Sequence, residues 1–486
     1  MTQYRPILTV LALAAALCSP ARVTAQPAGA PTPAQGQRPP LTLDAGKRGV
    51  ILDSLYANLV RTYVEEDTAH MIVDVVRKRQ RAGAYGALVN PSQFAEAVTT
   101  DLRRVNGDLH LSLRHEPGGG RGVGGPMIIR SGAGGPGGPG GGPIIVHGSP
   151  RGPGVAGGQG DSLLARIPYF RDAARQNFGF TKIEILPGNV GYLAVSGFLG
   201  VPGHEQVMAG ALRFLERTDA IIIDVRTNRG GSGNMSHLLF SHFLPAQPVQ
   251  TIKVTSRQTA EPRVQESIAE VPGPRRTDVP LYVLTSRGTG SAAEEFAFVL
   301  KSLGRATIVG DRTAGAGHMV SMVGLPDGFT AGVSITRVSD PRTGREFEGI
   351  GVEPDIAVEQ ERALATAHVA ALKGLAAKAP DDAARRRIEL LTEWIEAKDR
   401  GTRVDAARAA SVVGAYEGER TVTLRDGHLY YQRGRSPVSE LIPLASGGFS
   451  LDGDARIRFA DGAPAGGITI ELGDGTTTRY GRVAEK

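Results

Sequence analysis

The segment VLTSRGTGSAAEEFAFVL, residues 283–300, has the pattern of a buried strand, a glycine-bearing turn and a helix. Apolar residues recur at three- and four-residue spacing after the turn, which predicts one buried helix face. That face comprises Ala293, Phe296, Ala297, Leu300 and Leu303. Ser291 stands in the first helical turn, where its hydroxyl and the N–H of Ala292 lie at the positive end of the helix dipole. The position suits a nucleophile whose reaction forms an oxyanion, although Ser291-x-x-Glu294 is equally the signature of a capping box.

The length and the charge of the chain limit its number of domains and its possible partners. The 486 residues leave room for about two to four domains with a sizeable core. The formal net charge of +6 comes from scattered arginines, without a Lys/Arg stripe interleaved with aromatic residues. The sequence therefore gives no support to nucleic-acid binding.

The first 25 residues have the composition of an export signal. Arg5 supplies the positive start, Ile7–Leu17 forms the short apolar region, and Val23-Thr-Ala25 offers small residues for cleavage after Ala25. The only cysteine, Cys18, lies inside this signal, so the mature chain is expected to have no disulfide and no thiol chemistry. No later stretch predicts a membrane helix. We expect a periplasmic or secreted protein that begins with a disordered Pro/Ala-rich linker over residues 26–42.

Residues 43–105 predict a helical N-terminal domain. A second helix is expected over 69–79, and a third begins near Pro91 with Ser92 as a plausible cap. The apolar face expected for the first helix is formed by Val50, Leu52, Leu55, Leu59 and Tyr63.

The next segments carry two histidines of different expected character. Residues 106–116 predict a turn and then an alternating strand that places His110 on its polar face. Residues 117–162 are dominated by Gly and Pro, apart from an apolar island at 142–147, and predict a flexible surface loop or tether. His147 in that loop is expected to be solvated, because no Cys, His or Asp cluster surrounds it.

Strands and helices alternate over residues 163–360, which predicts a mainly parallel, layered α/β core. Residues 361–400 predict a helical segment broken at Pro380. Residues 401–486 alternate short strands with Asp-Gly turns, which is typical of a small antiparallel sheet or barrel.

Three features of the core together suggest acyl-transfer chemistry. Ser291 follows a strand and a turn, Gly230 and Gly231 follow the strand IIIDVR, and histidines and carboxylates occur elsewhere to complete a base relay. The two glycines could instead serve only a tight turn. They match neither of the glycine-rich phosphate-binding patterns. The adjacent Glu294 and Glu295 are more easily explained as first-turn dipole partners than as a catalytic dyad.

Five stretches in the same order resemble the tail-specific, or C-terminal-processing, serine protease family. They are VNGDLHLSL, IIIDVRTNRGGSG, LTSRGTGSAAEEFAFVLK, RATIVGDRTAGAGH and EGIGVEPDI. The resemblance is greatest to the branch that contains the tricorn protease core and the interphotoreceptor retinoid-binding protein repeats. It covers roughly residues 43–358 and implies a crotonase/Clp-type core of ββα units in a superhelix, with the helical N-terminal domain and the C-terminal all-β module attached.

The resemblance also implies roles for individual residues. Ser291 matches the family nucleophile, His110 matches the general base, and Glu348 matches the carboxylate that orients the base. Gly230 or Gly231, together with the N–H of Ala292, matches the oxyanion donors. No metal and no cofactor is implied. His318 and His115 remain rivals of His110 as the base.

The sequence departs from the family pattern at three places. Ala316 stands where the Ser–Lys branch has its lysine, which excludes that dyad, and Lys301 has no counterpart in the family. Leu109 and Leu111 flank His110 where the tricorn-like tetrad has a serine. The glycine-rich segment occupies the place of a PDZ domain, so we expect none.

We therefore expect an exported serine endopeptidase that cleaves peptide or protein substrates through an acyl-enzyme. The alternative is a non-catalytic protein that binds an apolar ligand on the same scaffold. An esterase is a weaker third possibility, since no G-x-S-x-G pattern surrounds Ser291. The oligomeric state stays open.

Overall fold

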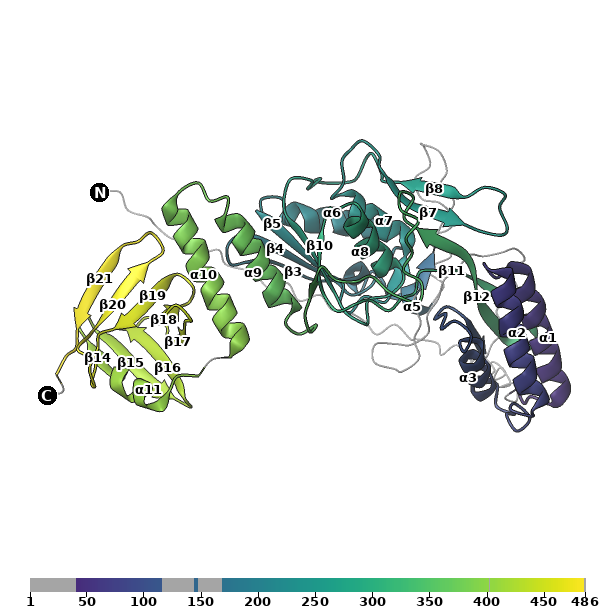
Figure 1. Cartoon of the computed structure of the whole chain (residues 1–486), viewed down its shortest axis with the longest axis horizontal. Helices are drawn as coiled ribbons and strands as arrows, with labels where there is room; N and C mark the ends of the chain where they lie inside the picture. The colour runs from purple at the N-terminus through teal and green to yellow at the C-terminus, as the bar shows by residue number, and fades with distance from the viewer. Residues whose placement is uncertain (1–40, 116–143, 147–167, 402, 485–486) are drawn as a thin grey trace, which may run out of the picture. The chain divides into compact units, whose positions relative to one another are not determined.

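The computed structural model describes residues 41–115, 144–146, 168–401 and 403–484 (Figure 1). The expected signal, nearly all of the 26–42 linker and most of the glycine-rich loop, including His147, lie outside the described residues. Three helices form the N-terminal part: α1 (Ala45–Thr62), α2 (Glu66–Arg81) and α3 (Pro91–Leu102).

Two details of these helices differ from expectation. The cap of α3 is Asn90, whose side chain accepts from the N–H groups of Ser92 and Gln93, so the assignment of the cap to Ser92 was wrong. Pro91 takes the first helical position, where a missing N–H costs nothing. Val50 was expected on the buried face of α1 but is 56% exposed, because the core lies on the side of Ile51 and Leu55.

A six-stranded sheet forms the centre of the core and runs in the order β13-β10-β9-β5-β4-β3. All neighbours are parallel except β3 and β4, which form a hairpin, so the parallel core predicted from the alternation is confirmed for this sheet. The strands are β3 (Phe180–Leu186), β4 (Val190–Val195), β5 (Ala220–Asp224), β9 (Leu281–Thr285), β10 (Thr307–Gly310) and β13 (Ile356–Ala357).

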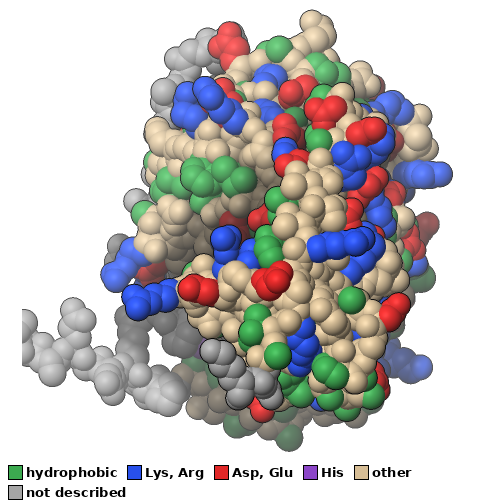
Figure 2. All heavy atoms as spheres, turned by 90° about the vertical axis from the view of Figure 1, so that its left-hand side faces the viewer, with side chains coloured by type: hydrophobic (Ala, Val, Ile, Leu, Met, Phe, Trp, Pro, Cys, Tyr) green, Lys and Arg blue, Asp and Glu red, His purple; other side chains and the backbone are tan. Residues whose placement is uncertain are grey.

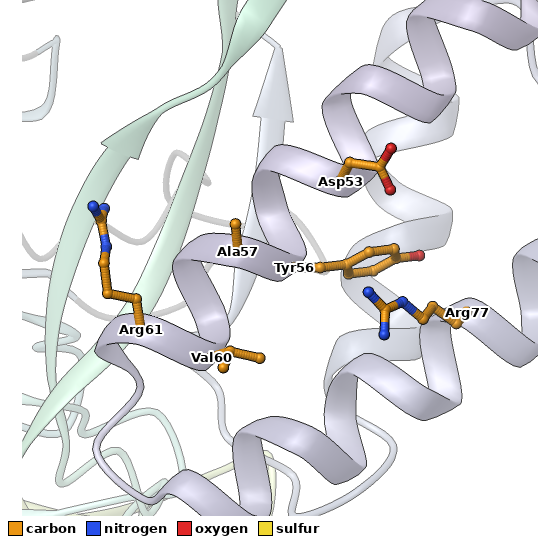
Figure 3. A pocket seen from close by; sticks show the side chains of 6 residues that line it. All are labelled: Asp53, Tyr56, Ala57, Val60, Arg61 and Arg77. Carbon is orange, nitrogen blue, oxygen red and sulfur yellow. The ribbon is translucent and has the colours of Figure 1, made fainter.

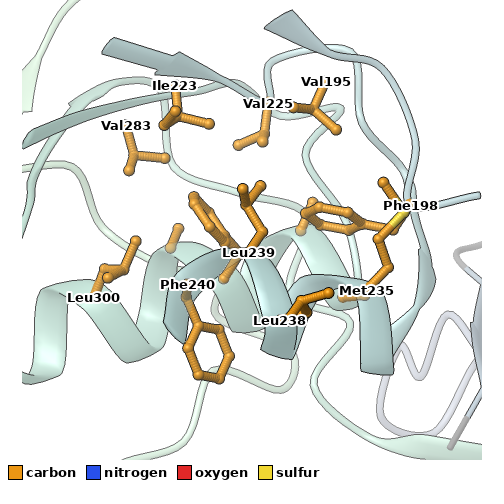
Figure 4. Packing of buried hydrophobic residues seen from close by; sticks show 14 of the residues in the cluster. Val195, Phe198, Ile223, Val225, Met235, Leu238, Leu239, Phe240, Val283 and Leu300 are labelled. Atoms are coloured by element: carbon orange, nitrogen blue, oxygen red, sulfur yellow. The ribbon is translucent and has the colours of Figure 1, made fainter. Parts of the chain in front are cut away.

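Apolar helices cover both faces of this sheet. One face packs against α6 (His204–Phe214), α7 (Gly233–Ser241) and α8 (Ala292–Ser302). Figure 4 shows Leu239 of α7 and Leu300 of α8 pointing toward the sheet that carries Ile223 and Val283, and Met235 of α7 beside Phe198. The other face packs against α9 (Ala363–Ala376). Because both faces are buried, β5 is apolar along nearly its whole length.

A second sheet is antiparallel, so the core as a whole is mixed. Its order is β1-β12-β7-β8, and β11 also pairs with β12. The strands are β1 (Ser112–His115), β7 (Gln250–Thr255), β8 (Arg263–Glu266), β11 (Met319–Gly324) and β12 (Phe329–Ser339). The long β12 also contacts the N-terminal helices, where the N–H of Val64 donates to the carbonyl of Ser334 at 2.9 Å.

Shorter elements complete the core. The apolar island of the glycine-rich segment contributes β2 (Ile144–Val146), which pairs in parallel with β6 (Gly230–Ser232). The others are α5 (Pro168–Arg171), η1 (Asn177–Gly179) and η2 (Pro326–Gly328).

The C-terminal part follows a helical hairpin of α9 and α10 (Asp382–Arg400), with the expected break near Pro380. A short helix, α11 (Ala406–Val412), precedes eight antiparallel strands in sequence order. An isolated bridge between Tyr416 and Arg482 brings the two ends of this sheet together, which confirms an all-β, barrel-like module. The strands are β14 (Gly414–Tyr416), β15 (Arg420–Arg425), β16 (His428–Arg433), β17 (Ser439–Pro443), β18 (Phe449–Leu451), β19 (Ala455–Phe459), β20 (Gly467–Leu472) and β21 (Thr477–Gly481).

The charge of the surface and the apolar character of the helices are relevant to possible binding partners. On the face drawn in Figure 2, basic and acidic side chains are interspersed. Among the described helices, none has the length and apolar character needed to cross a bilayer.

Candidate active site

Ser291 occupies a strained backbone position at the N-terminus of α8. Its φ of 54° and ψ of −118° are unusual for a residue with a side chain, and such strain is retained mainly at functional sites. The residue is fully buried, and its hydroxyl has no hydrogen-bond partner among the described residues. The α8 cap is therefore not made by the Ser291 hydroxyl. That hydroxyl lies at the positive end of the helix dipole.

Gly230 of β6 lies directly against Ser291. A Cβ added at Gly230 would stand 2.9 Å from the Ser291 Cβ and 3.1 Å from the Ala292 nitrogen. Only glycine fits there, and its φ of 105° likewise disfavours a side chain. The N–H of Gly230 donates to Asn228 Oδ1 at 2.8 Å. Because the N–H of Gly230 already has this acceptor, Gly231 and Ala292 are the better candidates among the three predicted oxyanion donors.

Glu294 fixes the turn that carries Ser291. Burial raises the pKa of its carboxyl, and hydrogen bonds from Thr313 and from backbone N–H groups act against that rise. Glu294 Oε2 accepts from the N–H of Ser291 at 2.7 Å, which is the Glu294 side of the expected capping box. The same carboxylate accepts from the Thr313 hydroxyl and from the N–H groups of Gly315 and Ala316. Glu294 thus joins the turn at Ser291 to the loop at 311–318, a role missed when it was treated as a dipole partner.

Glu348 binds the C-terminal end of the loop at 311–318. Its Oε2 accepts from the N–H groups of Gly317 and His318 at 2.6 and 2.7 Å. Its Oε1 lies 3.7 Å from His318 Nδ1. The two backbones approach closely, since a Cβ on Gly317 would stand 2.8 Å from the nitrogen of Glu348. Glu348 is therefore held beside His318.

Asp108 lies between the two candidate histidines and is completely buried. Its Oδ1 accepts from the backbone N–H of His110 at 2.9 Å and lies 3.8 Å from His110 Nδ1. Its Oδ2 lies 3.3 Å from His318 Nδ1 and accepts from the Tyr63 hydroxyl at 3.0 Å. The Tyr63 hydroxyl accepts in turn from the side-chain amide of Asn106 at 2.7 Å.

Strand pairing on β12 explains why these distant residues meet. β1 begins two residues after His110, and β11 begins directly after His318. Both strands pair with β12, and Gly332 is the register partner of Ser112 on one side and of Met322 on the other. A Cβ on Gly332 would stand 2.8 Å from the His110 carbonyl, so a glycine is needed between the two edges.

The three ionisable side chains of Asp108, His318 and Glu348 form a cluster in which their pKa values are shifted in different directions. Burial alone would raise the pKa of Asp108, but the hydrogen bond and charge of His318 and the charge of His110 hold it well below its usual range. Burial lowers the pKa of His318, and Asp108 and Glu348 more than reverse that effect. Burial and the charge of Asp108 raise the pKa of Glu348 to about 8. Near neutral pH the arrangement therefore favours an ionised Asp108 beside a protonated His318.

The expected site residues thus fall into two groups. Ser291, Ala292 and Gly230 are in direct contact, and Gly231 follows on the same strand. His110 is not on the polar face of a strand but in the buried turn before β1. Glu348 has hydrogen bonds to the His318 loop, so its expected action on His110 stays a prediction.

The rival residues fall in different places. His115 packs its ring on Phe329 at the end of β1, with centroids 4.9 Å apart. Lys301 donates to the Glu353 carbonyl and pairs with Asp355, which occupies its ammonium. Asp108 was missed as a site residue, although its place two residues before His110 in the Asp-Leu-His sequence was a usable signal.

One group of potential metal ligands is found among the described residues, and it comprises Asp108, His318 and Glu348. Their ligand atoms lie within 4.8 Å of one another. Each carboxylate already accepts hydrogen bonds from protein groups, and the imidazole is shared between them. These hydrogen bonds account for the cluster without an ion, and we assign no metal to it.

A surface pocket of about 480 Å³ lies elsewhere, lined by residues of α1 and by Arg77 of α2 (Figure 3). Arg77 stacks over the Tyr56 ring, with its guanidinium carbon 5.0 Å from the centroid. The lining includes no group of the Ser291 site. It comprises Asp53, Tyr56, Ala57, Val60, Arg61 and Arg77.

Part of the core is similar in sequence to known proteins. Residues 189–358, which include Ser291, Gly230 and Glu348, match the model of peptidase family S41. A carboxyl-terminal-processing protease of Synechocystis sp. is 34% identical over 177 residues, which are 36% of this chain and 39% of that protein. The carboxy-terminal processing protease CtpB of Bacillus subtilis is 30% identical over 175 residues, 35% of this chain and 34% of that protein.

The matched region is thus well under half the length of these curated relatives. Among solved structures, the photosystem II D1 C-terminal processing protease aligns over 66% of this chain and 94% of that one, with 20% identity and a TM-score of 0.38. Residues 189–358 of the chain are therefore similar to peptidase family S41 and to carboxyl-terminal-processing proteases.

Proposed function

We propose that the chain is an exported serine endopeptidase that uses Ser291 as its nucleophile. The observation that carries the proposal is the state of Ser291. It combines a positive φ, a helix N-terminus and a buried hydroxyl without a hydrogen-bond partner among the described residues. A structural cap would use its hydroxyl, whereas a nucleophile must keep it available.

The proposed reaction proceeds in two stages. His110 takes the proton from the Ser291 hydroxyl while its oxygen forms a bond to the peptide carbonyl carbon. The C–N bond then breaks, and His110 returns the proton to the leaving amine. Water attacks the resulting ester by the same proton route and frees Ser291. We assign Glu348 to the His110 relay, as the family resemblance implies.

The proposed oxyanion donors are Gly231 and Ala292. Gly230 provides the close backbone approach, while its own N–H is held by Asn228. The N–H of Ala292 is at the start of α8, where the helix dipole supports a developing negative charge.

Finer assignments belong to the same proposal. A core of the crotonase type, the absence of a PDZ domain and export to the periplasm or medium follow from the family resemblance and from residues 1–25. Peptide or protein substrates are proposed from the same family, whose curated relatives are named as carboxyl-terminal-processing proteases.

Fluorophosphonate labelling of the mature protein tests the proposal. The modified residue is mapped by mass spectrometry in the wild type and in Ser291→Ala and His110→Ala. We expect labelling at Ser291 that is lost in Ser291→Ala and at least about 100-fold slower in His110→Ala. A folded wild-type protein that takes no label at Ser291 contradicts the proposal.

One observation favours the second candidate, a protein that binds an apolar ligand. Ser291 is completely buried, so a substrate reaches it only after the surrounding chain opens. Copurification of lipid with a protein that takes no label would support that candidate.

A further inference from the structure

We propose that His318 is a positioning residue of this site, which shares Asp108 with His110 and thereby sets how strongly His110 binds a proton. The inference rests on the proposed function, since it gives His110 the role of base. It assigns to His318 a task other than being that base.

The geometry places one carboxylate between two imidazole rings. Asp108 Oδ1 faces His110 Nδ1 at 3.8 Å, and Asp108 Oδ2 faces His318 Nδ1 at 3.3 Å. The carboxylate is fully buried and is fixed by the Tyr63 hydroxyl and by the backbone N–H of His110. Because solvent does not screen it, a charge on one ring is felt strongly on the other side.

His318 is itself fixed from two sides. Its backbone N–H is held by Glu348 Oε2, and its ring meets the Tyr63 ring edge-on, with centroids 6.4 Å apart. Glu348 Oε1 lies 3.7 Å from His318 Nδ1, so the ring nitrogen that faces Asp108 also faces the carboxyl group of Glu348. A ring held in this way can keep a positive charge despite its burial.

A positive charge on His318 partly neutralises Asp108 and thereby lowers the affinity of His110 for a proton. Beside an uncompensated buried carboxylate, an imidazole binds its proton too tightly to act as a base near neutral pH. The positive ring of His318 offsets that carboxylate, so His110 can be neutral and accept the proton of Ser291. The raised pKa of His318 and the lowered pKa of Asp108 agree with this division of charge.

Other ionisable groups also face the cluster. Tyr63, at the end of α1, and Arg103, after α3, act electrostatically with Asp108. Glu348 and Glu65, the latter preceding α2, act on His318. A substitution confined to residue 318 leaves all four in place, so its effect on His110 reports the charge of His318.

The test measures the proton affinity of His110 directly. Carbon-13 labelling of the histidine rings gives an NMR titration curve for each ring, and His110→Gln identifies the signal of His110. His318→Gln removes the charge and keeps a hydrogen-bonding side chain, whereas His318→Lys keeps the charge. His368→Gln is the matched control, since His368 is a buried histidine on α9 whose ring contacts the Pro187 carbonyl.

We expect His318→Gln to raise the pKa of His110 by about 1 unit. His318→Lys and His368→Gln should leave it within about 0.3 units of the wild type. In the wild type itself, the curve of His110 should deviate from a single-site titration as His318 loses its proton. This last measurement needs no change at residue 318 and applies even if His318→Gln does not fold.

Labelling of Ser291 separates this inference from the proposed function. We expect the acid limb of the labelling rate in His318→Gln to move to higher pH by the same amount as the pKa of His110. If Ser291 is labelled and the pKa of His110 is the same in both His318 variants, with a single-site wild-type curve, the inference is wrong. Complete loss of labelling in folded His318→Gln at every pH would make His318 the base and also overturn it. If the wild type takes no label but His110 responds to His318, the proposed function fails and the coupling stands.

Discussion

Gly230 and Ser291 are packed so closely that a Cβ on Gly230 would lie 2.9 Å from the Cβ of Ser291. The two residues come from β6 and from the start of α8, and each has a positive φ. The strained turn of the candidate nucleophile and the glycine strand of the candidate oxyanion site are therefore one packing unit. A change in either residue acts on the other.

Gly230→Ala should lower the rate of fluorophosphonate labelling at Ser291 by at least about 10-fold and also destabilise the fold, because the new methyl group meets the backbone of Gly290 as well. Gly210→Ala is the matched control, since a Cβ at this α6 position meets nothing within 4 Å. That control should label normally and be slightly more stable. Equal labelling rates in the two variants would show that the close contact has no functional consequence.

Ser291→Gly and Ser291→Ala should both abolish labelling but differ in stability. Alanine keeps the strained φ, and the lost hydroxyl had no hydrogen-bond partner among the described residues, so the thermal midpoint should stay within a few degrees of the wild type. Glycine relieves the strain and should be more stable than alanine by about 1 kcal/mol. Thermal unfolding of the two variants gives the comparison, and a glycine variant less stable than the alanine variant would count against strain at Ser291.

Glu294→Gln keeps the shape of the side chain but should strongly lower the stability of the fold. The carboxylate accepts from Ser291, Thr313, Gly315 and Ala316, and an amide nitrogen in place of one oxygen cannot accept from these donors. Each buried donor left without an acceptor costs about 1–3 kcal/mol. Urea unfolding should show this loss together with slower labelling. The control Glu346→Gln, at a partly exposed pair with Arg337, should cost no more than about 1 kcal/mol.

The contribution of Glu348 to the stability of the folded chain should fall as the pH rises from about 5 to about 8. The pKa of Glu348 is about 8 in the folded chain, above its ordinary value of 4.5, so the folded state keeps a proton that the unfolded chain releases. The raised pKa of His318 acts in the same direction. The lowered pKa of Asp108 acts only in acid, where stability is lost as the pH drops below the ordinary aspartate range.

Glu348→Gln mimics the protonated carboxyl and should flatten this decline. Thermal midpoints measured across the range should show a smaller drop for Glu348→Gln than for the wild type, while Glu346→Gln should follow the wild type. A wild-type midpoint that rises toward pH 8 would contradict the raised pKa of Glu348.

Several features could be predicted from the sequence because they depend on local patterns. The strand, turn and helix around Ser291 follow from apolar spacing and glycine, and β9 and α8 appear where these signals place them. The N-terminal helices and the C-terminal β-module follow in the same way from periodicity and from Asp-Gly turns. The boundary at α3 failed, because Asn90 and Ser92 are both good caps and only the fold selects between them.

The sequence by itself therefore determined the order of elements, the candidate nucleophile and the resemblance to a protease family. The tertiary structure decided which groups meet at the site. Asp108 and His318 are 210 residues apart in the chain and are joined only because β1 and β11 pair with the two edges of β12. The same holds for the burial of Glu294 and the engagement of the Gly230 amide, because hydrogen-bond partners and desolvation arise from packing between distant segments and leave no periodic signal in the sequence.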